Sequence, residues 1–262
     1  MNKIENHSNK YVNFVSDEHF LKCIETLYEA YARAKNKISK TKFYKNKIDT
    51  IKLTFDSKFN ELSEEELIKA EVSRQIDKSV NNAIGSFHEQ ILGGVDGYEI
   101  GNLSGFDIKA EDNSLFADIK NKHNTMNSSS SESLFQKLSR YADDHRLDDA
   151  KCYWVQILST KSFNEKWFSV INGKEYGHSR VYKISGDQFY SLLTGEKDAF
   201  LQLYKALPLG IEDFLKTLDA SKQEENSILS EIKKSANRSK RSILDEITFE
   251  NYGYYVDFDK LS

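Results

Sequence analysis

Apolar residues spaced three and four positions apart predict two long helices in the first third of the chain. The first begins near Ser16 and Asp17, whose side chains can cap a helix. The side chains that it would bury are Phe20, Ile24, Leu27 and Tyr31. The second helix covers residues 64–92, because Ser63 and Glu66 form a capping box before it and two glycines follow it.

The pattern then changes to short segments that are typical of strands. We expect strands near residues 98–100, 106–109 and 115–122, a helix capped by the serines at 128–131, and a strand at 151–159. The last of these is apolar on both faces, which indicates a central, buried strand. Weaker patterns predict a helix at 48–60 (which also fits a strand), a hairpin turn at Asn172–Gly173, a strand at 181–184, helices at 188–193, 198–207, 211–221 and 221–245, and a strand at 252–258. This order is typical of an α/β protein with a mixed central sheet flanked by helices.

Two of these strands bring two acids and a lysine together. Alternate side chains of a strand share a face, so Asp118 and Lys120 lie on one side, about 7 Å apart along the backbone. The polar turn at 111–114 returns the chain, and Asp107 can then lie opposite Asp118. Two carboxylates and an ammonium on one sheet face are costly to assemble unless they hold a hard cation such as Mg²⁺ and a phosphate. The pattern indicates a metal-dependent phosphodiesterase; from the spacing alone, an exposed ion pair on an edge strand is the alternative.

These residues also resemble a known motif. Asp107, ten residues, and then Asp118-Ile119-Lys120 resemble the PD-(D/E)XK nuclease motif, without its proline and with Asp in the second acidic position. The polar run at 121–131 is similar to that of type II restriction endonucleases that cut GGNCC-type sites, and the resemblance covers roughly residues 60–160. It implies a PD-(D/E)XK core, Mg²⁺ as cofactor, and hydrolysis of both strands of a short double-stranded DNA site to 5′-phosphate and 3′-hydroxyl ends. It further implies a homodimer on a palindromic site and a cognate methyltransferase that acts on the same site.

The resemblance assigns roles to individual residues. Asp107 and Asp118 would be metal ligands, and Lys120 would stabilise the transition state and orient or deprotonate the attacking water. Family members often carry a helical acid that helps to hold the metal or its water, and Glu89 is the candidate here. A solvated glutamate near a helix end is the alternative, although a negative charge there opposes the helix dipole.

Candidate DNA contacts lie in two parts of the sequence. The polar run after the motif offers groups that can bond to base edges, although loop formation explains the same residues. Its candidates are Asn121, Lys122, His123, Asn124, Asn127 and Ser128. Residues 33–47 hold seven Lys or Arg and no acid, and a second basic cluster lies at 233–241; a solvated helix face is the alternative for each. The candidates in the first cluster are Lys37, Lys40 and Lys42. His178 and Arg180 form a further polar pair that fits a surface strand equally well.

Composition sets the frame for these interpretations. With 262 residues, of which 39% are hydrophobic, the chain can form one substantial core. We expect one nuclease domain over 1–262, with a basic helical region at 1–62, a catalytic core at 63–160 and a C-terminal α/β region at 161–262. The net charge of −4 does not exclude DNA, because the distribution of charge matters more than its sum.

The composition also bears on the cellular setting. No run of about 18 apolar residues exists, and no apolar leader stands at the N-terminus, so we expect a cytoplasmic protein. Cys23 and Cys152 fit buried free thiols better than a disulfide. Neither a zinc-like spacing of Cys and His nor a phosphate-binding loop is present.

The sequence leaves two rival functions open. One is a repair or structure-selective nuclease with the same core, which would cut DNA without sequence preference. The other is a catalytically inactive DNA-binding module, which would bind DNA without cutting it in Mg²⁺ or Mn²⁺.

Overall fold

The computed structural model describes residues 9–36, 40–101, 105–122, 126–144, 149–171, 173–218 and 228–252. The chain divides into two compact units: a sheet unit, residues 1–27 and 84–219, and a helical unit, residues 28–83 and 220–262. The helices α1 (Asp17–Asn36) and α4 (Glu64–Leu92) each have residues in both units. That the whole chain is one nuclease domain stays a prediction.

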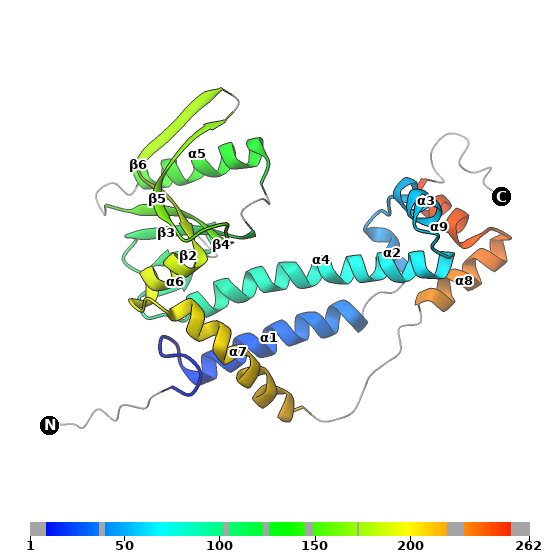
Figure 1. Ribbon diagram of the computed structural model, residues 1–262, viewed down its shortest axis with the longest axis horizontal. Helices are drawn as coiled ribbons and strands as arrows, with labels where there is room; N and C mark the ends of the chain where they lie inside the picture. Colours follow the sequence, from blue (N-terminus) through cyan, green and yellow to red (C-terminus); the bar gives the residue numbers. More distant parts are fainter. Residues whose placement is uncertain are drawn as a thin grey trace. The chain divides into compact units, whose positions relative to one another are not determined.

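A six-stranded mixed sheet forms the centre of the sheet unit (Figure 1). In spatial order its strands are β1 (Tyr98–Ile100), β2 (Ile108–Ala110), β3 (Leu115–Lys122), β4 (Lys151–Leu158), β6 (Lys174–Ser185) and β5 (Asn164–Ile171). The neighbours β3, β4 and β6 run parallel, and the other pairs are antiparallel. β4 lies between two strands and is buried on both faces, as its sequence predicts. The mixed sheet with its flanking helices confirms the predicted α/β class.

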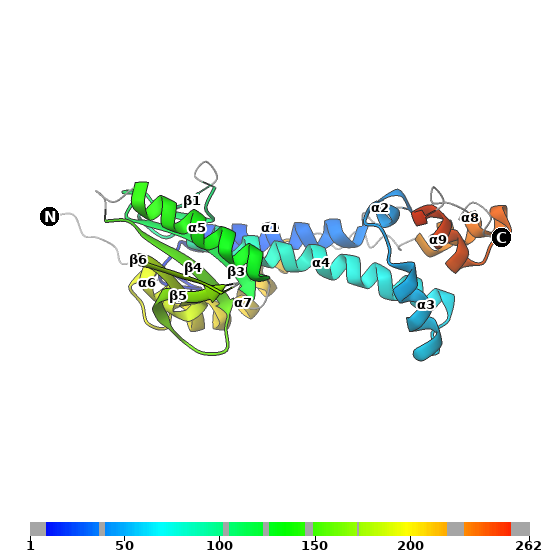
Figure 2. The same ribbon diagram turned by 90° about the horizontal axis from the view of Figure 1, so that it is seen from above.

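Helices cover both faces of this sheet, and Figure 2 shows α5 on the opposite side from α6 and α7. These helices are α5 (Ser128–Asp144), α6 (Gly186–Thr194) and α7 (Ala199–Lys216). Leu115 and Ile119 of β3 belong to a core shared with α1, α4, α6 and α7, whereas Phe116 belongs to a second core shared with α5. Because side chains alternate along a strand, Asp118 and Lys120 lie on the α5 side with Phe116.

The helical unit has a separate core. Its helices are α2 (Lys40–Lys45), α3 (Thr50–Phe59), the first part of α4, α8 (Ile228–Ser239) and α9 (Ile243–Tyr252). The buried side chains between them include Phe43, Tyr44, Ile48, Leu53, Leu67, Ile68, Val72, Ile232 and Ile247. The predicted capping box is confirmed at the start of α4, where the N–H of Ser63 donates to the Glu66 carboxylate at 2.8 Å.

One helix replaces the two that were predicted between residues 198 and 221. α7 continues through Pro208 and Gly210, which the sequence suggested as a boundary. A Cβ on Gly210 would lie 2.4 Å from the Phe20 ring and 2.8 Å from Ile24 Cδ1. The prediction is wrong here because this glycine serves close packing against α1 and does not end the helix.

Two other predictions need correction. Residues 50–59 are helical as expected, but Ile51, Phe55 and Phe59 are exposed and Leu53 is buried in their place. β5 was not predicted, and β6 begins well before the expected strand at 181–184. Most side chains of β5 are exposed, so its sequence lacks the alternation that marks a half-buried strand. The strand predicted at 252–258 lies, apart from Tyr252 at the end of α9, outside the described residues.

Two observations concern the cellular setting. Both cysteines are buried and unpaired, as predicted, and burial raises the pKa of each thiol to about 12. In the described part of the chain, we find no helix with both the length and the apolar character needed to cross a bilayer. Cytoplasmic localisation stays a prediction.

Candidate active site

The strand β3 places the predicted acid and lysine on one face. Asp118 is buried, with 7% of its surface exposed, while Lys120 is half-buried at the edge of an open groove. Their side chains form an ion pair, which confirms the predicted shared face. The parallel register with β4 puts Gln156, a buried amide, beside Lys120.

Asp107 meets this pair from the neighbouring strand. It directly precedes β2, and its N–H donates to the carbonyl of Ala117 at 2.9 Å. Since Ile108 pairs with Ala117, Asp107 stands at the register position opposite Asp118, as predicted. Its Oδ2 accepts the N–H of Ile119 at 2.5 Å, so the carboxylate lies against the backbone between Asp118 and Lys120. The three residues of the motif therefore converge on one short stretch of β3.

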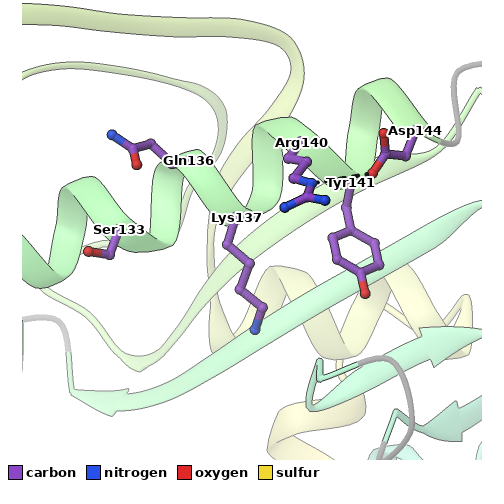
Figure 3. Close-up of a pocket in the computed structure, with 6 residues that line it drawn as sticks. All are labelled: Ser133, Gln136, Lys137, Arg140, Tyr141 and Asp144. Carbon is purple, nitrogen blue, oxygen red and sulfur yellow. Dashed lines mark ion pairs between the residues drawn. The ribbon is translucent and has the colours of Figure 1, made fainter.

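A second lysine completes the group. Lys137 extends from α5 toward the sheet (Figure 3), and its Nζ lies 3.1 Å from Oδ2 of Asp118. The same ammonium donates to the carbonyl of Gly105 at 2.5 Å and lies 4.2 Å from the centre of the Phe106 ring. Two cations thus pair with one buried carboxylate, and one of them also contacts the loop that carries Asp107.

The sequence interpretation missed Lys137, although a signal was available. Lys137 stands three residues after Leu134 and four before Tyr141, at the edge of the apolar stripe of α5. A lysine at the edge of such a stripe can turn toward the core side of a helix, where its charge needs a partner. The sequence does not say which strand supplies that partner.

Burial and neighbouring negative charge raise the pKa of two acids of the site, Asp107 and Glu89. Burial is the main cause that raises the pKa of Asp107, and the charge of Asp118 adds to it, while the Ile119 N–H and the two lysines oppose it. Burial also raises the pKa of Glu89, in the last turn of α4, and Asp107 adds to that rise. Glu89 therefore lies within electrostatic reach of the site. This arrangement of mutually repelling acids favours a cation among them.

An open groove lies beside these charges. Its volume is about 490 Å³, and its lining residues are Asp118, Lys120, Met126, Ser129, Ser130, Ser133 and Leu134. A second hollow of about 540 Å³ continues along α5 from Ser133 to Asp144, with Gln136, Lys137 and Arg140 in its wall (Figure 3). The two hollows share Ser133, so the polar side of α5 runs from the acids to Arg140.

The predicted DNA contacts beside the motif have different surroundings. Asn121 and Lys122 end β3, half-buried and exposed respectively, and Ser128 begins α5. The Asn127 Oδ1 accepts the N–H of Ser130 at 2.9 Å, so it caps α5. His123 and Asn124 lie outside the described residues.

The basic clusters are partly neutralised within the helical unit. Lys40 pairs with Glu250 at 3.1 Å and Glu246 at 3.7 Å, which speaks against a phosphate contact. Lys42 is exposed on α2, and Lys37 lies outside the described residues. In the second cluster, Lys233 pairs with Glu65 and Arg241 with Glu246. DNA binding by the first cluster stays a prediction.

The other candidate pair occupies the surface strand that the sequence allowed. His178 and Arg180 of β6 both contact Asp143 of α5, at 3.2 Å and 3.4 Å. The contacts tie β6 to the end of α5, and they explain both side chains without a ligand.

The donor atoms at the site fit a hard divalent cation. Asp107 and Asp118 supply only carboxylate oxygens, the ligands that Mg²⁺ prefers. The buried Oδ1 of Asp118 accepts no hydrogen bond from the described residues, although the Lys120 ammonium is within ion-pair distance. Such an oxygen is a natural metal ligand. Among the described residues, we find no group of three or more His, Cys, Asp or Glu side chains arranged to hold a metal, so Asp107 and Asp118 are the two acids that fit direct contact with the ion.

Comparison with known proteins identifies the class. Residues 12–216 match the family model of the Eco47II restriction endonuclease. The chain is 40% identical over 262 residues to the type II restriction enzyme Sau96I of Staphylococcus aureus, covering 96% of this chain and 100% of the relative. It is 30% identical over 213 residues to the type II restriction enzyme Eco47II of Escherichia coli, covering 78% and 88%. With its mixed α/β fold, the protein is a type II restriction endonuclease, a site-specific deoxyribonuclease. It belongs to the Eco47II restriction endonuclease family.

Proposed function

We propose that this restriction endonuclease is a Mg²⁺-dependent enzyme with a PD-(D/E)XK core that cuts both strands of a GGNCC-type DNA site. The observation that carries the proposal is the convergence of Asp107, Asp118 and Lys120 beside an open groove. Water adds to phosphorus and gives up a proton, the bond from phosphorus to the 3′ oxygen breaks, and the 3′ oxygen takes up a proton. The products are a 5′-phosphate and a 3′-hydroxyl end.

The two acids of the motif are the proposed metal ligands. Asp107 and Asp118 would hold Mg²⁺, and Glu89 would bind a water of its shell. A bound Mg²⁺ polarises the phosphate, lowers the pKa of water and offsets charge on the leaving oxygen. The N–H of Ile119 fixes Asp107, so the backbone of β3 determines the position of one ligand relative to the other.

The two lysines have different proposed roles. Lys120 lines the groove, and its ammonium can turn from Asp118 to the phosphate, where it stabilises the negative charge of the transition state and orients the attacking water. Lys137 is a positioning residue, because its ammonium joins Oδ2 of Asp118 to the carbonyl of Gly105. It keeps Asp118 oriented when Lys120 turns away.

The strand-to-helix connection is the proposed reading segment. The segment at 121–128 runs from the last two residues of β3 to the first residue of α5, and its Met126 lines the groove, so we expect this part of the chain to approach bases beside a phosphate in the groove. Asn121, Lys122, His123, Asn124 and Ser128 are the proposed contacts, and Asn127 supports them by capping α5.

A homodimer is the proposed form on DNA. A GGNCC-type site has two-fold symmetry, and one active site per strand is supplied most simply by a two-fold dimer. A methyltransferase acting on the same site would protect host DNA, and it need not bind this protein.

Digestion of phage DNA tests the proposal. Purified protein is incubated with phage DNA in Mg²⁺, and the fragment ends are sequenced. We expect discrete fragments whose ends fall within GGNCC-type sites and carry 5′-phosphates. A smear without preferred ends would indicate a non-specific nuclease, and gel-shift binding without cleavage in Mg²⁺ or Mn²⁺ would indicate an inactive DNA-binding module.

A further inference from the structure

The helix α7 has two apolar faces, and only one of them is covered. The covered face packs on the core of the sheet unit through Ala199, Leu203, Ala206, Gly210 and Phe214. A second row of apolar residues is exposed, namely Leu201, Tyr204, Pro208, Ile211, Leu215 and, just past the helix end, Leu218. We call this row the α7 stripe. Tyr204 alone leaves 72% of its surface exposed, which is costly for a residue of its size.

The spacing of the α7 stripe is that of a helix-packing seam. Its members follow one another at intervals of three and four residues, the a and d pattern of a heptad. At about 100° per residue they fall within an arc of roughly 100°, largely on the opposite side of α7 from its buried residues. An amphipathic surface helix needs only one such face, so the second one indicates a partner helix.

Charged residues beside the stripe identify that partner. Lys205 and Glu212 flank the stripe on one side, both exposed, and neither forms an ion pair with another described residue. If a second α7 lies antiparallel, Tyr204 faces the partner's Leu215 and Pro208 faces the partner's Ile211. Lys205 lies between these two pairs of facing residues and meets the partner's Glu212. The two-fold axis produces the same ion pair a second time.

A parallel arrangement gives no such match. In a parallel pair, the flanking positions that meet across the seam are five residues apart in sequence, so Lys205 would face the apolar Phe200 of the partner subunit. The α7 stripe is therefore self-complementary only with an antiparallel second copy of the chain.

We propose that the α7 stripe is the two-fold interface of the homodimer. This inference rests on the proposed function, which calls for a dimer but does not say which surface forms it. A helix of 18 residues is about 27 Å long, so two such helices make an interface at the small end of stable ones. We expect association in the micromolar range without DNA.

Charge reversal tests the interface with matched variants. Lys205→Glu places two glutamates opposite each other at both ends of the seam, and Glu212→Lys places two lysines there. Sedimentation equilibrium should show roughly tenfold or greater weakening of dimerisation for each single variant. The double variant Lys205→Glu/Glu212→Lys should recover the dimer. An equimolar mixture of the two single variants should also dimerise, because both of its cross-pairs attract.

A charge placed at an exposed apolar position, inside or outside the α7 stripe, supplies the control. Leu215→Glu should abolish the dimer, whereas Phe55→Glu on α3, an equally exposed apolar position, should leave it intact. Thermal unfolding checks that each variant folds. Wild-type protein that is monomeric at all accessible concentrations would overturn the proposal, and so would a dimer that none of the α7 variants alters. A dimer with these responses but no DNA cleavage would overturn the proposed function and leave the interface standing.

Discussion

Replacing Lys137 by methionine tests whether a lysine outside the motif supports catalysis. Methionine keeps most of the unbranched stem and removes only the ammonium, which pairs with Asp118 Oδ2 at 3.1 Å and with the Gly105 carbonyl at 2.5 Å. A hydrogen bond to a charged group contributes about 1.5–3 kcal/mol. The Lys137 side chain is 33% exposed, and solvent screening weakens the interaction, so we take the lower end of that range, about 1.5–2 kcal/mol. The cleavage rate should fall roughly 10- to 30-fold.

Single-turnover cleavage of a labelled duplex, with enzyme in excess, measures this effect without product release. Arg140→Met is the matched control, because Arg140 lies on the next turn of α5 in the same hollow but pairs with Asp144 at 3.7 Å. Lys120→Met should cost at least about a hundredfold, as expected for a group that stabilises transition-state charge. A Lys137→Met enzyme within twofold of wild type, or an equal loss from Arg140→Met, would refute the positioning role.

Three further predictions follow from the site and the core. Asp118→Ala and Lys120→Ala should each abolish cleavage yet still bind the cognate duplex in a gel shift with Ca²⁺, and loss of specific binding would contradict a purely catalytic role. Cys23 and Cys152, with thiol pKa values raised to about 12 by burial, should resist a thiol reagent such as DTNB at pH 8 until the protein is unfolded; fast labelling of folded protein would be the contrary result. Burial lowers the pKa of His88 to about 4. Between about pH 6.5 and pH 4, this histidine is therefore protonated in the unfolded chain and neutral in the folded protein. The free energy of unfolding should drop by up to about 3 kcal/mol over that range, and His88→Asn, which can keep a hydrogen bond to the Tyr190 hydroxyl, should flatten the urea-measured dependence.

Elements with strong local signals were predictable from the sequence. The capping box and two glycines mark the ends of α4, and two-sided apolar character marks β4 as central. The convergence of Asp107, Asp118 and Lys120 could be predicted from the alternation of side chains along a strand and from one tight turn. Both of these features depend only on residues that are neighbours along the chain.

Features that depend on distant contacts were not predictable in this way. Gly210 lies inside α7, where its missing side chain lets Phe20 of α1 pack closely. Nothing near position 210 in the sequence indicates that contact. Ile51 and Phe55 have a helical pattern, but the core of the helical unit takes Leu53 instead. Lys137 entered the site only when the structure showed which face of α5 lies over β3.

The central claim is that the carboxylates of Asp107 and Asp118 hold one divalent ion beside the groove. The most direct measurement is anomalous X-ray scattering from crystals of the protein with its DNA site and Mn²⁺. We predict a peak in direct contact with an oxygen of each of the two carboxylates and with one DNA phosphate. A peak elsewhere in a complex that cleaves DNA, with both carboxylates free of metal, would contradict the account.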